Sequence, residues 1–304
     1  MSTVADAAPL LPRRGIQLRW SHLAIHGFLL FYTFVALAPV VMIVMNSVKR
    51  SDQIFGHPFA LPTPGTIDTI GYHTVFSVGR FGTYFENSLI VTVSAVFLVV
   101  ALSAMASFAL AEYRFPGNTA LGLFFALGIM VPIRLGTVSI LKLTKKMQLL
   151  SGDGWFGGLL GPHYAPLLGL ILVYTAMGIP LGIFLMSQFM RQVPTELKNA
   201  ARVDGAGEFR LFALVLPLVR PGLAAVAVFT MLPVWNDLWF PLILTSANKD
   251  AWTVTLGAQQ FLGQYSSDWN AALAALTLAA VPVILLYVIF SRQFLRGLTE
   301  GALK

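Results

Sequence analysis

Few residues in this sequence are of the kind that carries out chemistry, and their spacing supports no catalytic site. The 304 residues include no cysteine, which excludes disulfides, thiol nucleophiles and thiolate metal ligands. The chain has no Gly-x-x-x-x-Gly-Lys-Ser/Thr motif, so it has no loop of that type to hold the phosphates of a nucleotide. His22 and His26 are four residues apart, but such residues at the edge of an apolar segment more commonly lie among lipid headgroups. We therefore expect no catalytic residue, no metal and no bound cofactor.

Polar residues are concentrated in two other places. The segment from 191 to 220 carries eight charges and is interrupted by Asp204-Gly205. A second segment, about 221–247, is apolar except for one acid, Asp237. The neighbours of this acid are Trp235, Asn236 and Trp239. If the second segment spans a membrane, its charge is costly and must face a polar partner or cavity. Asp237 is then either a structural hydrogen-bond anchor or part of a polar path.

The composition indicates an integral membrane protein. Hydrophobic residues make up 57% of the chain, charged residues only 11%, and the mean hydropathy is +0.76. A soluble domain carries roughly a quarter charged residues. A helix that spans a bilayer needs about 20 mostly apolar residues. The sequence therefore predicts an all-α polytopic protein with six transmembrane helices, at about 23–45, 87–111, 115–133, 166–190, 221–247 and 269–291.

The distribution of basic residues predicts how the spans are oriented. Six spans place both termini on one side, which then carries 12 of the 20 lysines and arginines. Basic residues are enriched in cytoplasmic loops, so we expect tails 1–22 and 298–304 and loop 191–220 in the cytoplasm. Residues 46–86 become an external loop, predicted to be an irregular cap. The net charge of +7 is explained by these membrane flanks, and nucleic acid is not expected as a partner.

The charged loop contains the signals of two short helices. Thr195 is predicted to cap the first helix, and Glu196 in the first turn complements the helix dipole. Asp204-Gly205 ends this helix after Val203, because glycine readily adopts the left-handed conformation. A second helix is expected within 206–216. The two helices would share an apolar face of Ala200, Val203, Phe209 and Phe212.

Two interpretations of this loop remain open from its residues alone. It could be a solvated connection that carries ordinary basic residues of a cytoplasmic loop. It could also be a docking element, since a simple connection does not need two helices with an apolar face.

A resemblance favours docking. The segment ELKNAARVDGAGEFRLFALVLPLVRPGL, residues 196–223, looks like the cytoplasmic Glu-Ala-Ala loop of ABC-importer permeases. Phe115-Pro116-Gly117, WNDLWFPLILT (235–245) and FLRGLTEGALK (294–304) occur at the expected places. Together they resemble the shorter permease subunit of the maltose-type carbohydrate-uptake importers. The resemblance runs from about residue 25 to the C-terminus.

The resemblance implies a permease domain at 23–297 that works within a larger complex in the cell membrane. Its expected partners are a second permease subunit, two ATPase subunits that use ATP, an external sugar-binding protein and membrane lipid. In the family, the first helix of the loop docks in a groove of the ATPase, here with Ala200 and Ala201 inside it. The coupling residues so implied are Glu196, Asn199, Ala200, Ala201, Asp204, Gly205, Ala206, Leu216 and Pro217.

One position departs from the family pattern. Asn199 stands where the loop usually has its first glutamate, so any ion pair made there is absent or shifted. For the segment around Asp237, the resemblance adds a second role beside that of an anchor. Its tryptophans could stack on sugar rings in a translocation path formed by Trp235, Asn236, Asp237 and Trp239.

Other classes of function fit less well. A stand-alone secondary transporter or channel would be expected to show paired halves or an embedded charge relay. An intramembrane enzyme would need a pair of acids, or a Ser–His or His–Glu set, at membrane depth. Within the ABC class, a permease for a non-sugar solute is the main alternative.

Overall fold

A computed structural model describes the backbone of residues 20–150, 154–263 and 267–302, with side chains at 23–285 and at 288 within those ranges. The regular elements in these residues are all helical. Their bounds are α1 Trp20–Asn46, α2 Ser51–Gly56, α3 Ile70–Ser77, α4 Phe81–Glu112, α5 Asn118–Met130, η1 Ile133–Gly136, α6 Thr137–Lys146, α7 Trp155–Leu160, α8 Tyr164–Gln192, α9 Thr195–Val203, α10 Glu208–Val215, α11 Arg220–Asn236, α12 Trp239–Thr245, η2 Lys249–Ala251, α13 Val254–Gln259 and α14 Trp269–Ala302.

Three helices within the described residues are long and apolar enough to cross a membrane unaided. They are Leu23–Asn46 in α1, Phe81–Glu112 and Tyr164–Gln192. Two further pairs of helices pass the same test together but are bent between their members. The bend is 89° between α5 and 133–146, and 77° between α10 and α11. The described side chains of α14 give a shorter apolar helix, Trp269–Leu285. The structure thus shows an all-helical membrane protein with three to five candidate spans.

Several helix bounds differ from those expected. The predicted span 87–111 belongs to a helix that starts six residues earlier, at Phe81. The predicted span 115–133 contains a helix of only 13 residues, α5, because Pro132 follows it and the chain turns sharply. The predicted span 221–247 is not continuous, since α11 ends at Asn236 and α12 starts at Trp239. Helix α14 continues to Ala302, into the predicted tail 298–304, whereas tail residues 1–19 lie outside the described residues.

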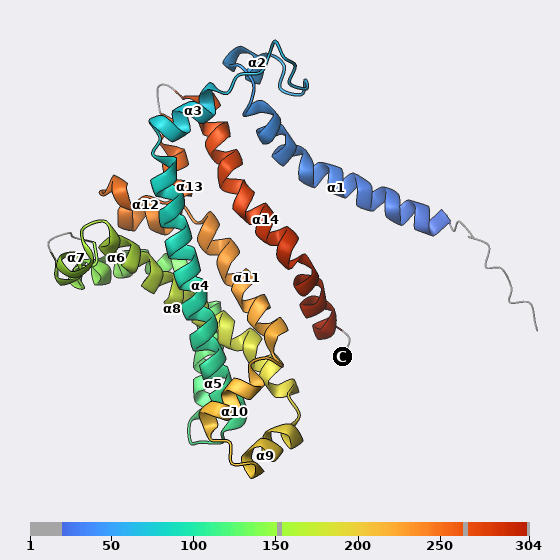
Figure 1. Ribbon diagram of the computed structural model, residues 1–304, viewed down its shortest axis with the longest axis vertical. Coiled ribbons are helices and arrows are strands. Elements are labelled where there is room, and N and C mark those ends of the chain that lie inside the picture. Colours follow the sequence, from blue (N-terminus) through green and yellow to red (C-terminus); the bar gives the residue numbers. More distant parts are fainter. Residues whose placement is uncertain (1–19, 151–153, 264–266, 303–304) are drawn as a thin grey trace, which may run out of the picture.

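The centre of the molecule is the pair α4 and α8 (Figure 1), and glycine allows these helices to approach closely. Gly178 and Gly182 form a Gly-x-x-x-Gly motif on α8, a pattern that lets helix backbones come together in membranes. A Cβ atom built on Gly182 would lie 2.2 Å from Oγ of Ser103, and one on Gly178 would lie 2.7 Å from Val99. Both neighbours are buried residues of α4. The sequence of α8 therefore fixes the contact with α4.

We expect Gly182→Val to destabilise the protein strongly, because the added methyl groups would enter the space of Ser103. Overpacking of this kind costs about 1–3 kcal/mol of unfolding free energy. The measurement is thermal unfolding of the detergent-solubilised chain. Gly122→Val in α5 is the matched control, since a Cβ there meets nothing within 4 Å. Equal stability of the two variants would contradict the packing of α4 on α8.

The two ends of α4 carry different structures. At one end lie α2, α3 and α13, and at the other lie α9 and α10 (Figure 1). The loop predicted as an irregular cap, 46–86, contains α2, α3 and the first six residues of α4. Lys49 pairs with Ile67 in an antiparallel bridge. An apolar cluster that includes Val75, Tyr84 and Ala271 joins this end to α13 and α14. The segment predicted as an external cap is therefore partly helical and packed.

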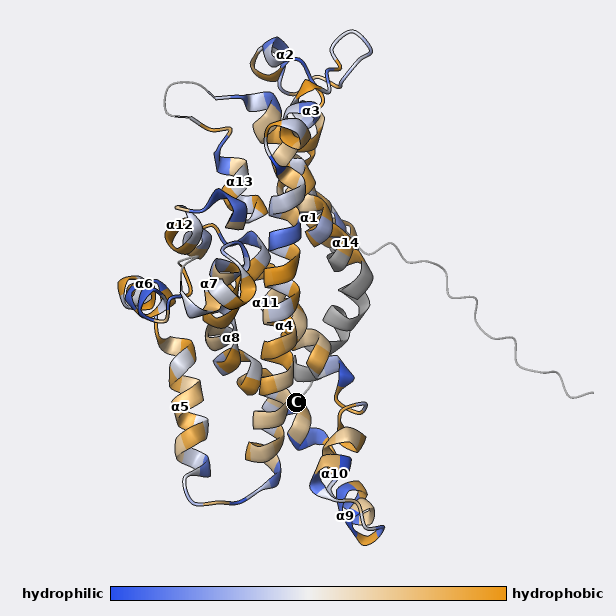
Figure 2. Ribbon diagram, turned by 60° about the vertical axis from the view of Figure 1, so that its left-hand side comes forward, coloured by the Kyte–Doolittle hydropathy of each residue, from blue (hydrophilic) through white to orange (hydrophobic). Residues whose placement is uncertain are grey.

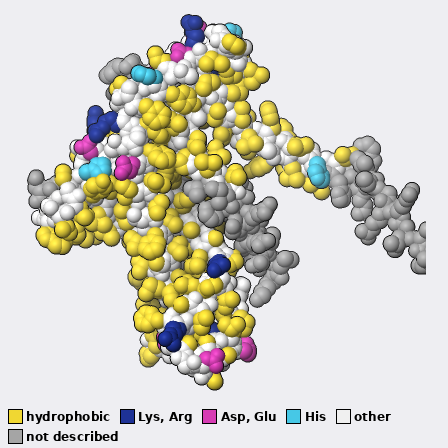
Figure 3. All heavy atoms as spheres, in the orientation of Figure 1, with side chains coloured by type: hydrophobic (Ala, Val, Ile, Leu, Met, Phe, Trp, Pro, Cys, Tyr) yellow, Lys and Arg dark blue, Asp and Glu magenta, His cyan; other side chains and the backbone are white. Residues whose placement is uncertain are grey.

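The surface between these ends is apolar. Hydrophobic residues dominate the long helices, and hydrophilic residues gather toward α9 and α10 and toward the opposite end (Figure 2). The face in Figure 3 shows hydrophobic side chains over the middle of the molecule, with charged ones above and below. Helix α1 leads away from the bundle, and its most apolar window has no buried residue. This arrangement fits a protein surrounded by lipid or by apolar partners.

Candidate functional site

The charged loop folds as the predicted pair of helices with a glycine turn between them. Helix α9 ends at Val203, and Gly205 has φ +81°, in the left-handed region. The amide of Gly205 donates to the carbonyl of Arg202 (3.0 Å), and the amide of Ala206 donates to that of Ala201 (2.9 Å). These are the two hydrogen bonds of a Schellman motif, which satisfies the last carbonyls of a helix. The turn after α9 is thus well defined.

One prediction about this loop is wrong. Thr195 does not cap α9, because the helix already includes Thr195 and its N-cap position is Pro194, which makes no side-chain hydrogen bond. The chain enters the helix through proline, whose fixed φ suits the position. The expected second helix is α10, Glu208–Val215, which is shorter than the predicted 206–216. Leu216 and the exposed Pro217 then lead through a 77° bend into α11.

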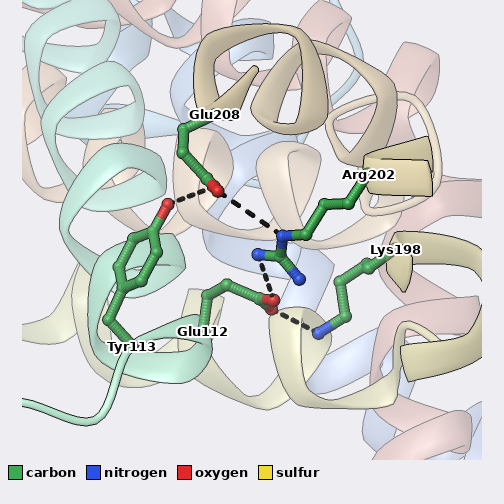
Figure 4. A network of polar contacts seen from close by, with 5 residues as sticks. All are labelled: Glu112, Tyr113, Lys198, Arg202 and Glu208. Carbon is green, nitrogen blue, oxygen red and sulfur yellow. Dashed lines mark hydrogen bonds and ion pairs between the residues drawn. The ribbon is translucent and has the colours of Figure 1, made fainter. Parts of the chain in front are cut away.

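The inner face of α9 is attached to the end of α4 by ion pairs (Figure 4). Nζ of Lys198 lies 2.5 Å from Oε2 of Glu112, and Nη2 of Arg202 lies 2.7 Å from Oε1 of the same carboxylate. The side chains of Glu112 and Lys198 are each only 9% exposed. Lys198 and Arg202 are four residues apart, which places them one above the other on a helix. One carboxylate therefore binds two cations of α9.

A second connection links α4 to the start of α10. The hydroxyl of Tyr113 donates to Glu208, which also accepts from Nε of Arg202 at 3.4 Å (Figure 4). Burial, and then the hydrogen bond to Glu208, raise the pKa of Tyr113 to about 12, so the phenol remains a donor at neutral pH. Hydrogen bonds from Arg202 to Glu112 and Glu208 raise the pKa of the guanidinium. Five side chains thus join α4, α9 and α10.

The outer face of α9 consists of the side chains that point away from these ion pairs. Glu196, Asn199 and Ala200 are exposed. Val203 is 87% exposed and Phe209 of α10 is 88% exposed. Exposed apolar side chains at a polar end of the molecule form a candidate surface for a partner. We call Glu196, Asn199, Ala200, Val203 and Phe209 the outer face below.

Two residues expected beside Ala200 lie elsewhere. Phe212 is expected on the same apolar face, and Ala201 is expected with Ala200 in the groove of the ATPase. Ala201 packs against the buried cluster formed by α4, α8 and α10, so it is not on the side of Ala200. Phe212 also packs there, with its ring 5.3 Å from that of Phe108. Ala206 and Leu216 are half-buried, and Asp204 and Gly205 are exposed in the turn. The helical period accounts for these differences, because Ala201 follows Ala200 by 100° around the axis.

Asp237 occupies the break between α11 and α12. Its carboxylate accepts hydrogen bonds from the hydroxyl of Tyr174 (2.8 Å) and from the amides of Phe240 (3.0 Å) and Trp239 (3.2 Å). These bonds satisfy the first amides of α12 and tie the break to α8. Asp237 therefore acts as the hydrogen-bond anchor that the sequence suggested as one of its two roles.

The neighbours of Asp237 differ in position. Trp235 is 3% exposed, and its Nε1 donates to the carbonyl of Ala279 in α14 (3.0 Å), so its ring is not free for stacking. Asn236 donates to the carbonyl of Leu232 within its own helix. Trp239 donates to Thr137 (3.0 Å) and lies under the guanidinium of Arg134, 5.6 Å from the ring centroid.

A cavity of about 290 Å³ lies beside Asp237 between α8 and α11. Its polar lining residues include Arg134, Tyr174, Thr230 and Asp237. Trp235, Asn236 and Trp239 do not line it. Of the four residues predicted for a path, one, Asp237, lines this cavity.

The residues of this polar network that sequence reasoning missed are Glu112 and Tyr113. The glutamate marks the end of the second predicted span, and nothing local distinguishes it from an ordinary flanking charge. The pair Lys198 and Arg202 is a signal that could have indicated Glu112. These two cations lie on one face of the predicted helix, and that helix has no acid on the same face to pair with them.

Known proteins resemble this chain over most of its length. The family described as binding-protein-dependent transport system inner membrane component matches residues 26–300. The diacetylchitobiose uptake system permease protein NgcG of Streptomyces coelicolor is 32% identical over 282 residues, which cover 92% of this chain and 88% of NgcG. The arabinooligosaccharides transport system permease protein AraQ of Halalkalibacterium halodurans is 29% identical over 279 residues, which cover 90% of this chain and 93% of AraQ.

A solved structure shares the fold. It is a chain in the crystal structure of a bacterial ABC transporter involved in the import of the acidic polysaccharide alginate, with a TM-score of 0.75 and coverage of 94% of this chain and 99% of that chain. Its sequence identity of 19% makes this a likeness of fold alone. The family match covers nearly the whole sequence, and the resemblance drawn from the charged loop is confirmed. The chain belongs to the binding-protein-dependent transport system inner membrane components, and it is a multi-pass permease subunit of an ABC transporter in the inner membrane.

Proposed function

We propose that this chain imports a sugar or oligosaccharide, and that ATPase subunits drive it through the outer face of α9 and α10. The observation that carries the proposal is the exposure of Val203 and Phe209 on helices whose other side is fixed to α4 by ion pairs. An apolar surface held in a rigid orientation suits docking into a groove. A simple solvated connection needs neither two strongly exposed apolar side chains nor an inner face that is fixed to α4 by ion pairs.

The proposed topology has six spans with both termini in the cytoplasm. The main helices of these spans are α1, α4, α5, α8, α11 and α14. Helices α9 and α10 lie at the opposite end of α4 from α2 and α3, which supports the placement of loops 191–220 and 46–86 on opposite sides of the membrane (Figure 1). The basic residues favour the cytoplasm for the side of α9.

The proposed complex contains four kinds of component besides lipid. Two ATPase subunits bind and use ATP, a second permease subunit pairs with this one, and an external protein delivers the sugar. The exposed apolar length of α1 supports contact with the second permease or with lipid, because most of its described side chains between 23 and 44 are exposed. This chain itself is proposed to bind no cofactor.

The proposed substrate class rests on the relatives. NgcG and AraQ bear names that assign them to diacetylchitobiose and arabinooligosaccharide uptake. A route along α8 is supported by the cavity beside Asp237 and by a second cavity of about 420 Å³, nearer the end that carries α9, lined by Ser187, Gln188 and Arg191 among others. A non-sugar solute remains the alternative within the same family.

The test of this proposal uses the absence of cysteine from the natural chain. Ala200→Cys places a single thiol on the outer face, and Ala60→Cys places one in the exposed external loop. We expect a membrane-impermeant maleimide added to intact cells to label Ala60→Cys and not Ala200→Cys. In the assembled transporter, a bifunctional crosslinker should join Ala200→Cys to an ATPase subunit. External labelling of Ala200→Cys, or no crosslink in an active complex, would refute the proposal.

A further inference from the structure

The carboxylate of Glu112 is buried at the end of α4, where it touches two cations of another helix. Its side chain is 9% exposed, and it lies 2.5 Å from Lys198 and 2.7 Å from Arg202. Lys198 is itself a buried cation, 7% exposed as a whole residue. Hydrogen bonds between ionised groups are shorter and stronger than neutral ones. These two contacts therefore hold α9 against α4 in one orientation.

Helices α4 and α9 are not consecutive in the sequence, so no short backbone connection joins them. Helix α8 continues into α9 through Val193 and Pro194, and α10 continues into α11 through residues 216–219. A displacement of α9 thus reaches α8 and α11 along the backbone. The last residue of α4, Glu112, precedes the first residue of α9, Thr195, by 83 positions. Helix α4 is joined to α10 by the apolar contact of Phe108 with Phe212, and to α9 by the Glu112 ion pairs.

We propose that Glu112 is a positioning residue that makes α4 move together with α9 when an ATPase subunit displaces the outer face. This inference rests on the proposed function of the outer face. Removal of one partner from a buried ion pair leaves an uncompensated charge in a poorly hydrated place, so separation of the two helices is costly. The pair therefore transmits a displacement of α9 to α4, which is packed along its length against α8.

Tyr113 and Glu208 add a second point of attachment to the same unit. Glu208 accepts from Tyr113 at the end of α4 and from Arg202 on α9, so Arg202 is held by two carboxylates (Figure 4). Two separate attachments prevent α9 from rotating about a single one. Lys198, in contrast, has Glu112 as its ion-pair partner within the described residues.

The experiment measures whether α9 and α4 move as one body. Spin labels are attached to Leu197→Cys on α9 and Arg114→Cys after α4, both exposed, in the complete transporter with its ATPase subunits. With Glu112 present, we expect one narrow distance that is the same without nucleotide and after trapping with ATP and vanadate. With Glu112→Gln, we expect the complex to assemble and hydrolyse ATP, while this distance broadens and changes by several ångströms on trapping.

Glu86→Gln is the matched control, because Glu86 is an exposed glutamate at the other end of α4. It should leave the distance narrow and unchanged. A narrow, nucleotide-independent distance in Glu112→Gln would overturn the proposal. Failure of the Ala200→Cys crosslink in an active complex would instead refute the docking surface on which the inference rests, so the two failures are distinguishable.

If the Glu112→Gln variant does not accumulate in the membrane, a variant with exchanged charges tests the positioning role of Glu112. Glu112→Lys combined with Lys198→Glu keeps one carboxylate between two cations, since residue 198 can still reach Arg202 at i+4. Recovery of both accumulation and the fixed distance supports the positioning role. Recovery of accumulation with a variable distance, or no recovery of accumulation at all, overturns it.

Discussion

Gly205→Pro is expected to leave membrane insertion intact and to abolish stable association with the ATPase subunits. Proline holds φ near −65°, whereas Gly205 has φ +81°. The substitution also removes the amide that donates to Arg202, and it disfavours the conformation of Asp204, whose ψ is 5°. The turn must rebuild, which changes the direction of α9 relative to α10. Copurification with the ATPases in detergent, and ATP hydrolysis by the reconstituted complex, measure the effect.

The control for this prediction lies two residues further along the chain. Gly207 has φ −71°, which proline adopts without strain, and it precedes α10 as its N-cap. We expect Gly207→Pro to retain ATPase association and hydrolysis within about twofold. Normal coupling in Gly205→Pro would show that the left-handed turn is not required. Equal loss in both variants would show only that the loop tolerates no proline.

The turn itself could be predicted from sequence because its signals are local. A glycine after Asp204 at the end of two turns of helix-forming residues indicates a helix end, and the hydrogen bonds of Gly205 and Ala206 agree. The all-helical class followed from composition in the same way. Apolar segments of about 20 residues leave few alternatives in a bilayer, where the backbone must satisfy its own hydrogen bonds.

The features that could not be predicted depend on contacts between distant segments. Glu112 is paired with residues 86 and 90 positions away, and no periodicity in the sequence links them. The break at Asp237 depends on Tyr174 in α8, 63 positions away. Hydropathy averages over such a break, so it predicted one continuous span where the structure has α11 and α12. The same limit applies to Trp235, whose partner Ala279 lies on α14.

The structure shows the surroundings of Asn199, the residue that departs from the family pattern. Asn199 lies on the outer face, and the cations on either side of it, Lys198 and Arg202, point inward to Glu112. The loss of the usual glutamate therefore leaves the inner ion pairs unchanged. In the proposed docking, the apolar side chains of the outer face would then contribute more of the binding free energy.

Replacing both of these apolar side chains should therefore weaken ATPase association strongly without harming the free chain. In Val203→Gln combined with Phe209→Gln, two residues that are 87% and 88% exposed become polar. Exposed substitutions usually change unfolding free energy by less than about 0.5 kcal/mol. Full burial of a valine or phenylalanine in a partner contributes about 1.5–3 kcal/mol, and each 1.4 kcal/mol is about tenfold in affinity. We expect association at least about a hundredfold weaker, measured by titrating labelled ATPase subunit against the permease in nanodiscs.

The matched control carries the same chemical change at the other end of the molecule. Phe59→Gln with Leu61→Gln replaces two side chains that are 77% and 73% exposed in the loop proposed to be external. If the outer face binds the ATPase, this pair leaves the titration unchanged, because an external residue is never in contact with a cytoplasmic subunit. A hundredfold loss in the control would mean that both pairs act through folding. Full affinity in Val203→Gln with Phe209→Gln would mean that the ATPase subunit binds the polar residues of α9. The exposed apolar side chains would then not contribute to ATPase binding.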